Sequence, residues 1–417
     1  MKKMSHRPFR NRASLTISLV LAGCGGSNGG GDVGAAGEKV TVVTVASAGP
    51  LVSAPTPTPT PMAADMAMTM GAMGSPTGSS ILAGIAAVPS GLNVAALLGS
   101  KRIPGTAAPD AVGAFRFLCG PGQVLPDDPI VYPGQRGRAH LHQFFGNLGA
   151  NANSTYASLR SSGESTCMNE LNRSAYWMPA MLDGRGNVVR PDGVSIYYKR
   201  RPKTDPFCTT VAKGCADIPR GLRLIFGWDQ FRPNEAQPAN AARFHFHCTA
   251  NGHPTTAAFA NMVEPTKVCK VGQQLNAVIQ TPICWNGREI DSPDHRSHVV
   301  DAISDRTTNY RAQCPKTHPM LLPQFTMGVT WTISSGDDPK RWTLASDHMK
   351  PGGLPGETFH SDYFEAWEDR IRDRWSAGCI DRLLNCSDGD LGDGQILMRG
   401  RYYPYGVANP RLVPIPR

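Results

Sequence analysis

The sequence predicts a mainly β domain, built as a single large sandwich or jelly-roll-like core with long disulfide-pinned loops and few short helices. Short runs of strand-type composition, at residues 195–200, 222–228, 242–248 and 324–333, alternate with turns rich in Gly, Pro, Asp and Asn. Few stretches hold a helical period. The clearest is 361–375, where we expect a helix. This pattern favours packed sheets over a helical bundle.

The first 23 residues have the layout of a lipoprotein signal peptide. A basic segment precedes a short apolar run, residues 13–22, and the letters LAGC at 21–24 resemble a lipobox. The apolar run is too short to span a bilayer as a permanent helix. We therefore expect an exported protein that contacts the membrane through a lipid on Cys24. This places it at the cell envelope, in the outer membrane facing the periplasm or the exterior.

Removal of that segment changes the charge balance. The formal net charge of +9 falls to +4, because residues 1–23 carry five Lys or Arg residues and no Asp or Glu. More than half of the basic excess thus belongs to the export signal. No long Lys/Arg run remains, so we do not expect a nucleic-acid partner.

Residues 24–108 are predicted to form a disordered tether that leads to a globular domain at 109–417. The tether is rich in Gly, Ala, Pro and Met and includes PTPTPTP at 55–61, a composition that buries too little apolar surface to fold. A weak apolar patch at 81–99 is expected to form a short helix or to dock on the domain. Five methionines lie in the tether: Met62, Met66, Met68, Met70 and Met73.

These closely spaced thioethers suit soft ions such as Cu(I), and their spacing resembles methionine-rich segments of periplasmic copper proteins. Low-complexity composition, in which methionine is only another apolar residue, is the simpler explanation.

The chain has 11 cysteines, and ten remain if Cys24 carries lipid: Cys119, Cys167, Cys208, Cys215, Cys248, Cys269, Cys284, Cys314, Cys379 and Cys386. An even number in an exported chain predicts a disulfide framework of up to five bridges. The short intervals 208–215 and 379–386 suggest local loops closed by their own bridges. No C-x2-C pair occurs, and full pairing would remove thiolates as catalytic groups or metal ligands.

Two H-x-H pairs, His140/His142 and His245/His247, stand out among only 11 histidines. On a strand, residues i and i+2 point to the same face with side chains rooted about 6 to 7 Å apart, so both members can bind one ion. Neutral imidazole suits Zn, Cu, Fe or Ni. For any single histidine, a structural hydrogen bond is the competing explanation.

Carboxylates lie next to histidines in two further segments, DSPDHRSH at 291–298 and HSDYF at 360–364. A carboxylate beside an imidazole can ligate a metal, orient the ring or serve in acid/base catalysis. Turn formation is the alternative for 291–298. The predicted metal ligands are His140, His142, His245, His247 and His360, and the predicted catalytic groups are His298, Asp294, Asp291 and Asp362.

Four blocks at 128–147, 284–299, 314–325 and 360–368 resemble, in the same order, the blocks of the DUF1996 family. The resemblance covers most of residues 110–400 and includes H-x-H-x-F-x-G from His140 to Gly146. Tyr363 precedes Phe364 where the family pattern has Phe directly after Asp362. The family comprises exported bacterial and fungal proteins, and some fungal members carry cell-wall-binding modules. The resemblance implies a shared histidine-rich site and names no reaction.

Three functions follow as hypotheses. The first is a metal-dependent hydrolase or lyase, using copper or zinc, that acts on cell-envelope or extracellular polysaccharide. In it, the aromatic residues Trp177, Tyr197, Tyr198 and Trp285 are expected to be exposed and to stack on sugar rings beside Arg200 and Arg201, with core packing as the alternative for each. The second is a copper- or zinc-handling lipoprotein without catalysis. The third is a wall-glycan-binding module whose histidines only hydrogen-bond within loops.

Overall fold

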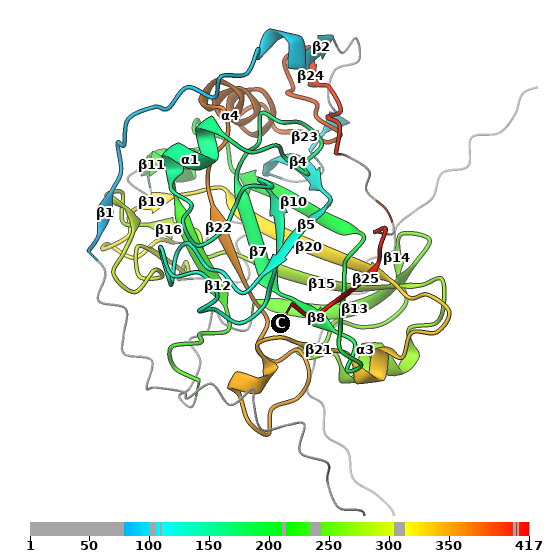
Figure 1. The fold of residues 1–417 in the computed structure, drawn as a ribbon. Helices are drawn as coiled ribbons and strands as arrows, with labels where there is room; N and C mark the ends of the chain where they lie inside the picture. The colour runs from blue at the N-terminus through cyan, green and yellow to red at the C-terminus, as the bar shows by residue number, and fades with distance from the viewer. Residues whose placement is uncertain are drawn as a thin grey trace, which may run out of the picture. The chain divides into compact units, whose positions relative to one another are not determined.

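Two packed β-sheets form the centre of the domain (Figure 1). The computed structural model describes residues 79–100, 106–108, 111–210, 214–233, 243–303, 313–402, 406 and 408–416. The smaller sheet has the order β12 (Arg223–Gly227), β22 (His360–Phe364), β7 (Ala175–Pro179), β6 (His142–Gly146) and β5 (Pro121–Leu125). The larger sheet has the order β14 (His253–Pro254), β13 (Phe244–Ala250), β15 (Gln274–Gln280), β20 (Gln324–Thr332), β10 (Gly193–Arg200), β4 (Gly113–Cys119), β23 (Leu384–Cys386) and β3 (Thr106–Ala107).

Small sheets and short helices lie around this pair. The small sheets comprise β11 (Gly214–Cys215), β19 (Met320–Leu321), β16 (Cys284–Trp285) and β18 (Val299–Val300); β21 (Thr343–Leu344), β8 (Met181–Leu182), β9 (Asn187–Val189) and β25 (Leu412–Pro414); β1 (Ile81–Leu82) with β17 (Glu289–Asp291); and β2 (Leu98–Ser100) with β24 (Gln395–Leu397). The α-helices are α1 (Tyr156–Ser161), α2 (Pro206–Thr210), α3 (Val263–Val268) and α4 (Asp369–Trp375). Single turns of 3-10 helix span Ala95–Leu97, Pro339–Arg341 and Asp347–Met349, and a π-turn spans Ser376–Ile380.

An aromatic core joins the two sheets. Phe325 of β20 stacks on Tyr176 of β7 and on Tyr363 of β22, with ring centroids 5.8 and 5.0 Å apart, and meets Phe226 of β12 edge-on at 5.7 Å. All four side chains are buried. Large aromatic rings contribute much of the apolar area that such a core removes from water. The predicted mainly β class with few short helices is confirmed.

The outer face of the five-stranded sheet is also covered. Phe144, Trp177, Ile225 and Phe364 project from it and pack with Ile130 of the loop that precedes β6. Side chains on this face are therefore buried although they point away from the main core. A polar group placed here is shielded from water as strongly as one between the sheets.

Four of the predicted strands are confirmed as parts of β10, β12, β13 and β20. The helix expected over 361–375 is wrong in its first half, because residues 360–364 form β22 and the helix α4 begins only at Asp369. Tyr363 packs in the main core and Phe364 packs on the outer face. β22 is buried on both faces although three of its five residues are polar, so neither alternation nor an apolar run marks it as a strand.

Five disulfides pair all ten cysteines of the domain: Cys119–Cys167, Cys208–Cys215, Cys248–Cys269, Cys284–Cys314 and Cys379–Cys386. The framework of five bridges is confirmed, and so are the two local loops of seven residues. Cys24 and the methionine-rich segment lie outside the described residues. None of the described helices is long and apolar enough to cross a membrane.

Residues 79–100, assigned to the tether from composition, lie on the domain instead. Strand β1 pairs with β17, and β2 pairs with β24. Ile81, Ile85 and Leu97 pack against the main core. Burial of these apolar side chains offsets the entropy lost when the segment is ordered. The segment therefore docks on the domain, which was one of the two outcomes expected for residues 81–99.

Candidate metal centre

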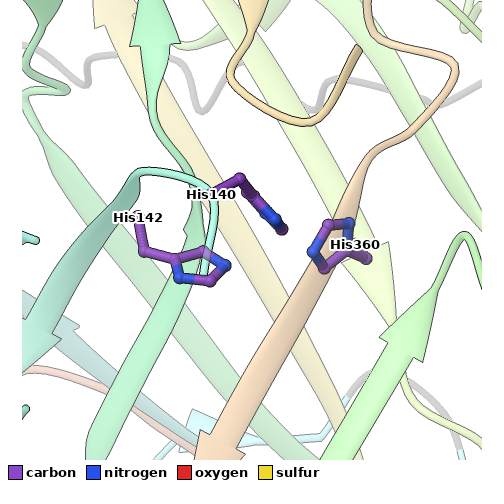
Figure 2. Close-up of side chains that lie close together, drawn as sticks. All are labelled: His140, His142 and His360. Carbon is purple, nitrogen blue, oxygen red and sulfur yellow. The ribbon is translucent and has the colours of Figure 1, made fainter. Parts of the chain in front are cut away.

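Three of the predicted ligands, His140, His142 and His360, converge at one point (Figure 2). The ring centroids of His140 and His142 are 4.2 Å apart, those of His140 and His360 are 5.0 Å apart, and those of His142 and His360 are 6.2 Å apart. One nitrogen from each ring lies within 4.8 Å of the other two. Two ligands of one zinc ion are separated by no more than about 4.2 Å, twice the Zn–N bond length, so small side-chain rotations bring the three rings to binding distance.

The register of the five-stranded sheet explains this convergence. Strands β6 and β22 flank β7, where His142 pairs with Pro179 and Asp362 pairs with Trp177. His360, two residues before Asp362, therefore lies on the other side of Pro179 from His142. The two backbones are about 10 Å apart, two strand spacings, and both imidazoles reach over the proline ring between them. His140 completes the group from the loop that leads into β6.

Backbone carbonyls fix the tautomers of two of these rings. Nδ1 of His142 lies 3.0 Å from the carbonyl oxygen of Asp127, and Nδ1 of His360 lies 2.8 Å from that of Thr358. A carbonyl oxygen only accepts, so Nδ1 donates its proton in both rings and Nε2 carries the lone pair. The Nε2 atoms of all three histidines are buried and have no hydrogen-bond partner among the described residues.

Two carboxylates adjoin the same cluster. Asp128, His142 and Asp362 also offer one ligand atom each within 4.8 Å of the others, so His142 belongs to both groups. Asp128 accepts hydrogen bonds from the backbone N–H groups of Ile130 and Val131, each at 2.8 Å, and one from Nε1 of Trp177 at 3.4 Å. Both carboxyl oxygens of Asp362 are buried without a hydrogen-bond partner in the part of the chain that is described.

Burial determines the charge state of this cluster. Desolvation lowers the pKa of His140 and His142 and, reinforced by His142, lowers the pKa of His360 to about 3. Desolvation, reinforced by Asp128, raises the pKa of Asp362 well above its ordinary value. At neutral pH the three rings are therefore uncharged and have lone pairs available, which is the form that binds metal.

Two further charged or polar groups lie beside the cluster. Arg296 is held by the carbonyls of Gly227 and Trp228 at 3.2 and 2.8 Å, and its charge opposes the rise of the Asp362 pKa. His348, an exposed residue whose Nδ1 bonds the carbonyl of Ala345, contributes to lowering the pKa of the partly exposed His140. The cluster is therefore closest to solvent on the side of His140 and His348.

The other predicted ligand pair, His245/His247, forms no part of this centre. The two rings lie on β13 with centroids 5.3 Å apart and are partly exposed. Phe244 and Phe246 alternate with them and are buried, as expected. Among the described residues, no third histidine, cysteine or carboxylate joins the pair to make a ligand group of three.

The segment 291–298 forms a hydrogen-bonded loop. Asp291 accepts from Arg223 at 3.1 Å and lies 2.8 Å from Nδ1 of His295, and Asp294 accepts from Ser292 at 2.6 Å. His298 is buried, with one ring nitrogen 2.9 Å from the Ser292 hydroxyl and the other 2.7 Å from the Arg223 carbonyl. The catalytic roles of these residues stay a prediction. Arg296 of the same loop lowers the pKa of Asp362 through its charge.

Of the aromatic residues predicted to contact sugars, Tyr197 is partly exposed, whereas the exposure expected for Trp177, Tyr198 and Trp285 was wrong. Trp177 and Tyr198 have no exposed surface, and Trp285 and Arg200 are 8% and 2% exposed. Arg200 bonds Asp217 and Asp381 at 3.0 and 2.8 Å. Aromatic composition predicts a stacking platform and a core equally well, and here the core accounts for all three rings.

Asp128, Arg296 and His348 were not selected from the sequence. Asp128 is the first residue of the first DUF1996-like block and lies in a turn-forming segment. Its place in that block is the feature of the sequence that could have marked it as a site residue. Arg296 lies between His295 and His298 in the second block quoted above. His348 belongs to none of the four blocks, and no pattern in the sequence marks it.

The fold and this cluster define a disulfide-bonded β-sandwich protein with a buried group of histidines and carboxylates suited to a metal ion. The family model described as "Domain of unknown function (DUF1996)" matches residues 128–367, which is more than half of the chain. The chain therefore belongs to the DUF1996 family. No curated protein and no solved structure matches it.

Proposed function

We propose that His140, His142 and His360 bind one transition-metal ion, zinc or copper, and that the ion serves a reaction on a polysaccharide. The observation that carries this proposal is the set of three buried Nε2 atoms that face one another without hydrogen-bond partners among the described residues. A buried acceptor left unpaired costs about 1 to 3 kcal/mol. A bound metal ion would satisfy all three atoms at once.

The donor set also leaves room for chemistry. Catalytic zinc sites commonly have three protein ligands and keep one position for water or substrate, and imidazole serves copper equally well. Asp362, with its raised pKa, would hold or release a proton next to the ion. Access to the ion would run past His140 and His348, on the more exposed side of the cluster.

We place the protein outside the cytoplasm, held at the outer membrane by a lipid on Cys24. The lipobox-like sequence supports the anchor, and five disulfides support an oxidising compartment. Envelope or extracellular polysaccharide is the substrate class we propose for such a location. The cell-wall-binding modules of fungal family members support the same choice.

Metal handling without catalysis is the second candidate. Burial of His142, His360, Asp128 and Asp362 favours it, because a site enclosed in this way excludes a bulky substrate and retains its ion. In this version the ion would be stored, or exchanged with the methionine-rich segment at 62–74. The two candidates share the metal centre and differ only in what the bound ion does.

Metal analysis of protein purified without a polyhistidine tag tests the shared part. One equivalent of zinc or copper is expected in the wild type after reconstitution, and less than a tenth in His142→Ala and in His360→Gln. The matched control is His247→Ala, which removes a histidine from the other H-x-H pair and should retain full metal content. Equal loss in the control, or no metal in the wild type, would overturn the proposal.

Activity separates the two candidates. The metal-loaded wild type is incubated with a panel of polysaccharides, and products are compared with those of His360→Gln. Products that depend on His360 support the enzyme. Tight metal binding without products, together with slower metal transfer when residues 62–74 are deleted, supports metal handling.

A further inference from the structure

The outer face of the eight-stranded sheet offers a second candidate site, separate from the metal centre. On β10, Val194, Ile196 and Tyr198 point into the main core, whereas Ser195, Tyr197 and Lys199 alternate with them and are partly exposed. The metal centre belongs to the outer face of the other sheet. The two sites thus lie on the two opposite outer surfaces of the sandwich.

The five adjacent strands of this face contribute no acidic side chain, and the nearest carboxylates lie at its margins, where Asp301 pairs with Arg243 and Asp192 accepts from Thr332. None of β13, β15, β20, β10 and β4 contains an Asp or a Glu. Their outward positions carry mostly hydroxyl, amide and basic side chains. Five neighbouring strands span about 19 Å at the usual spacing, so the face is long enough for an extended chain of several sugar units.

Two cations gather on one aromatic ring at one side of this face. The guanidinium carbon of Arg116 lies 5.6 Å from the ring centroid of Tyr197, and Nζ of Lys199 lies 5.0 Å from it. Arg116 also donates from Nε to the Ser195 hydroxyl at 3.0 Å. These contacts hold both side chains against the sheet, so part of the entropy of ordering them is already lost.

Neither cation is neutralised by a carboxylate in the described part of the chain. The salt bridges there include neither Arg116 nor Lys199, whereas the buried Arg160, Arg200 and Arg372 all pair with acidic side chains. Two like charges held around one ring repel each other, and an anion placed between them would relieve that repulsion.

The middle of the face is a shallow floor of small side chains, several of them polar. Tyr197 pairs with Thr326, and Ser195 pairs with Gly328, which in turn pairs with Val278 of the next strand. A methyl group added at Gly328 would meet only one atom, the Ser195 carbonyl oxygen at 3.9 Å, so the surface above this glycine is open. His245 pairs with Val278 and bounds this floor in the row of Ser195 and Gly328.

We propose that this face binds an anionic polysaccharide, with Arg116 and Lys199 contacting its acidic groups and the hydroxyls of Ser195 and Thr326 contacting its sugar hydroxyls. Charge complementarity carries the proposal: two cations without a carboxylate partner, on strands that contain no acidic residue, beside a shallow floor of hydrogen-bonding groups. The five disulfides favour a glycan over nucleic acid, because they belong to an oxidising compartment outside the cytoplasm. The proposal does not depend on the metal centre.

The test is affinity electrophoresis of the full chain in gels that contain polygalacturonate, its methyl ester or a neutral β-glucan. The methyl ester keeps the sugar backbone and removes the charge. Polygalacturonate should retard the wild type, and the other two should not. The double variant Arg116→Glu with Lys199→Glu should bind at least about tenfold more weakly, because two charge-assisted contacts become repulsive.

Two control variants, a check of folding and a second test variant keep the result interpretable. Lys340→Glu changes an exposed lysine outside this face and should leave binding unchanged. His360→Gln, which disables the metal centre, should also bind normally, so failure of the two proposals can be told apart. Circular dichroism checks that the double variant is folded, and Thr326→Arg, which adds bulk to the floor while raising the positive charge, should weaken binding as well.

If the methyl ester retarded the wild type as strongly as polygalacturonate does, the proposal would be overturned. It would also be overturned if Lys340→Glu lost as much binding as the double variant, because the effect would then depend only on net charge. Double-stranded DNA that competes as well as polygalacturonate, at equal charge concentration, would overturn the assignment to a glycan. Thr326→Arg with tighter binding would show that the floor is not used.

Discussion

The two H-x-H pairs of this chain have the same spacing but different surroundings. His140 and His142 have ring centroids 4.2 Å apart, and His245 and His247 have centroids 5.3 Å apart. The first pair meets His360 from β22 and two carboxylates, whereas the second faces outward from β13 and is joined by no third ligand among the described residues. The H-x-H spacing brings two rings together, but a group of three ligands forms only where another strand, here β22, supplies a third histidine.

The hydrogen bonds of the rings differ in the same way. In the first group, backbone carbonyls hold Nδ1 of His142 and of His360 and leave Nε2 directed at the other rings. In the second, Nδ1 of His247 is buried without a hydrogen-bond partner in the described part of the chain. Fixed tautomers are what prepare an imidazole for a metal, so only the first pair has the orientation that binding requires.

Metal-induced stabilisation should separate the two pairs by the largest margin. A ligand present at a thousand times its dissociation constant stabilises the folded state by about 4 kcal/mol, provided that it does not bind the unfolded chain. We expect zinc or copper to raise the melting temperature of the wild type and of His245→Gln with His247→Gln. The same addition should do nothing for His140→Gln with His142→Gln. Differential scanning calorimetry, with and without the metal, gives the measurement.

The contrast would fail if both double variants lost the metal-induced shift. That result would mean that the outer pair contributes to binding or that the shift reports nonspecific association. A third double variant, His253→Gln with His318→Gln, carries two substitutions at exposed or partly exposed histidines and controls for that association.

Gly227 tests how strictly the sheet positions His360. Its φ is +89°, and an added Cβ would lie 2.6 Å from the Phe359 carbonyl oxygen and 2.9 Å from Cα of His360. Gly336 has a similar φ of +93°, with nothing within 4 Å of an added Cβ. Gly227→Ala should therefore destabilise the fold by about 2 kcal/mol more than Gly336→Ala, because both share the backbone strain but only the first forces atoms apart.

Urea unfolding of the two alanine variants measures this difference. Because the displaced atoms belong to Phe359 and His360, Gly227→Ala should also weaken metal binding, and Gly336→Ala should not. Equal unfolding free energies would contradict the close packing at this point of the sheet.

The pH dependence of stability without metal reports the buried rings. The pKa of His360 is about 3 in the folded protein, against 6.5 for an ordinary histidine. Below pH 6.5 the unfolded chain binds a proton that the folded protein does not, so stability falls as pH decreases, by about 1.4 kcal/mol per pH unit. The raised pKa of Asp362 has the opposite effect, because it makes stability fall as pH rises above the ordinary pKa of an aspartate. This contribution is the same in the wild type and in the variant.

We therefore expect the wild type in EDTA to lose about 2 kcal/mol more stability between pH 6.5 and 5 than His360→Gln does. Urea unfolding at the two pH values provides the comparison. An identical loss in both proteins would show that His360 titrates normally and is not buried in a neutral form.

The strands and the disulfide framework could be predicted from the sequence because they depend on local patterns. Residues 195–200 and 324–333 have strand composition, and the even cysteine count predicted a framework of up to five bridges. The convergence of His142 and His360 could not be predicted, because it depends on β6 and β22 both pairing with β7, across more than two hundred residues of chain. Tyr363, Trp367 and Ile371 are four residues apart, so helical spacing concealed β22, whose polar residues do not alternate with apolar ones.

Tyr197 and Tyr198 show a second limit. Alternation gives the period of a strand but not which of two adjacent residues faces the core, so the sugar-contact prediction named both Tyr197 and Tyr198. The structure buries Tyr198 and Arg200 and turns Tyr197 and Lys199 outward. Only the pairing of β10 between β4 and β20 resolves this choice, because a shift of one residue exchanges the two faces.

The smallest expected effect belongs to the outer pair itself. His245 and His247 are partly exposed, and their pKa values are lowered only by partial burial and, for His247, by its neighbour. His245→Gln and His247→Gln keep the polarity and approximate size of each ring, so each should change the unfolding free energy at pH 7 by less than about 0.5 kcal/mol.

His142→Gln removes a ring buried between Phe144 and the Asp127 carbonyl and should cost about 1 to 3 kcal/mol under the same metal-free conditions. Urea unfolding of the three single variants tests the order, and a cost at His247 equal to that at His142 would contradict it, because the two pairs would then be equally integrated into the fold.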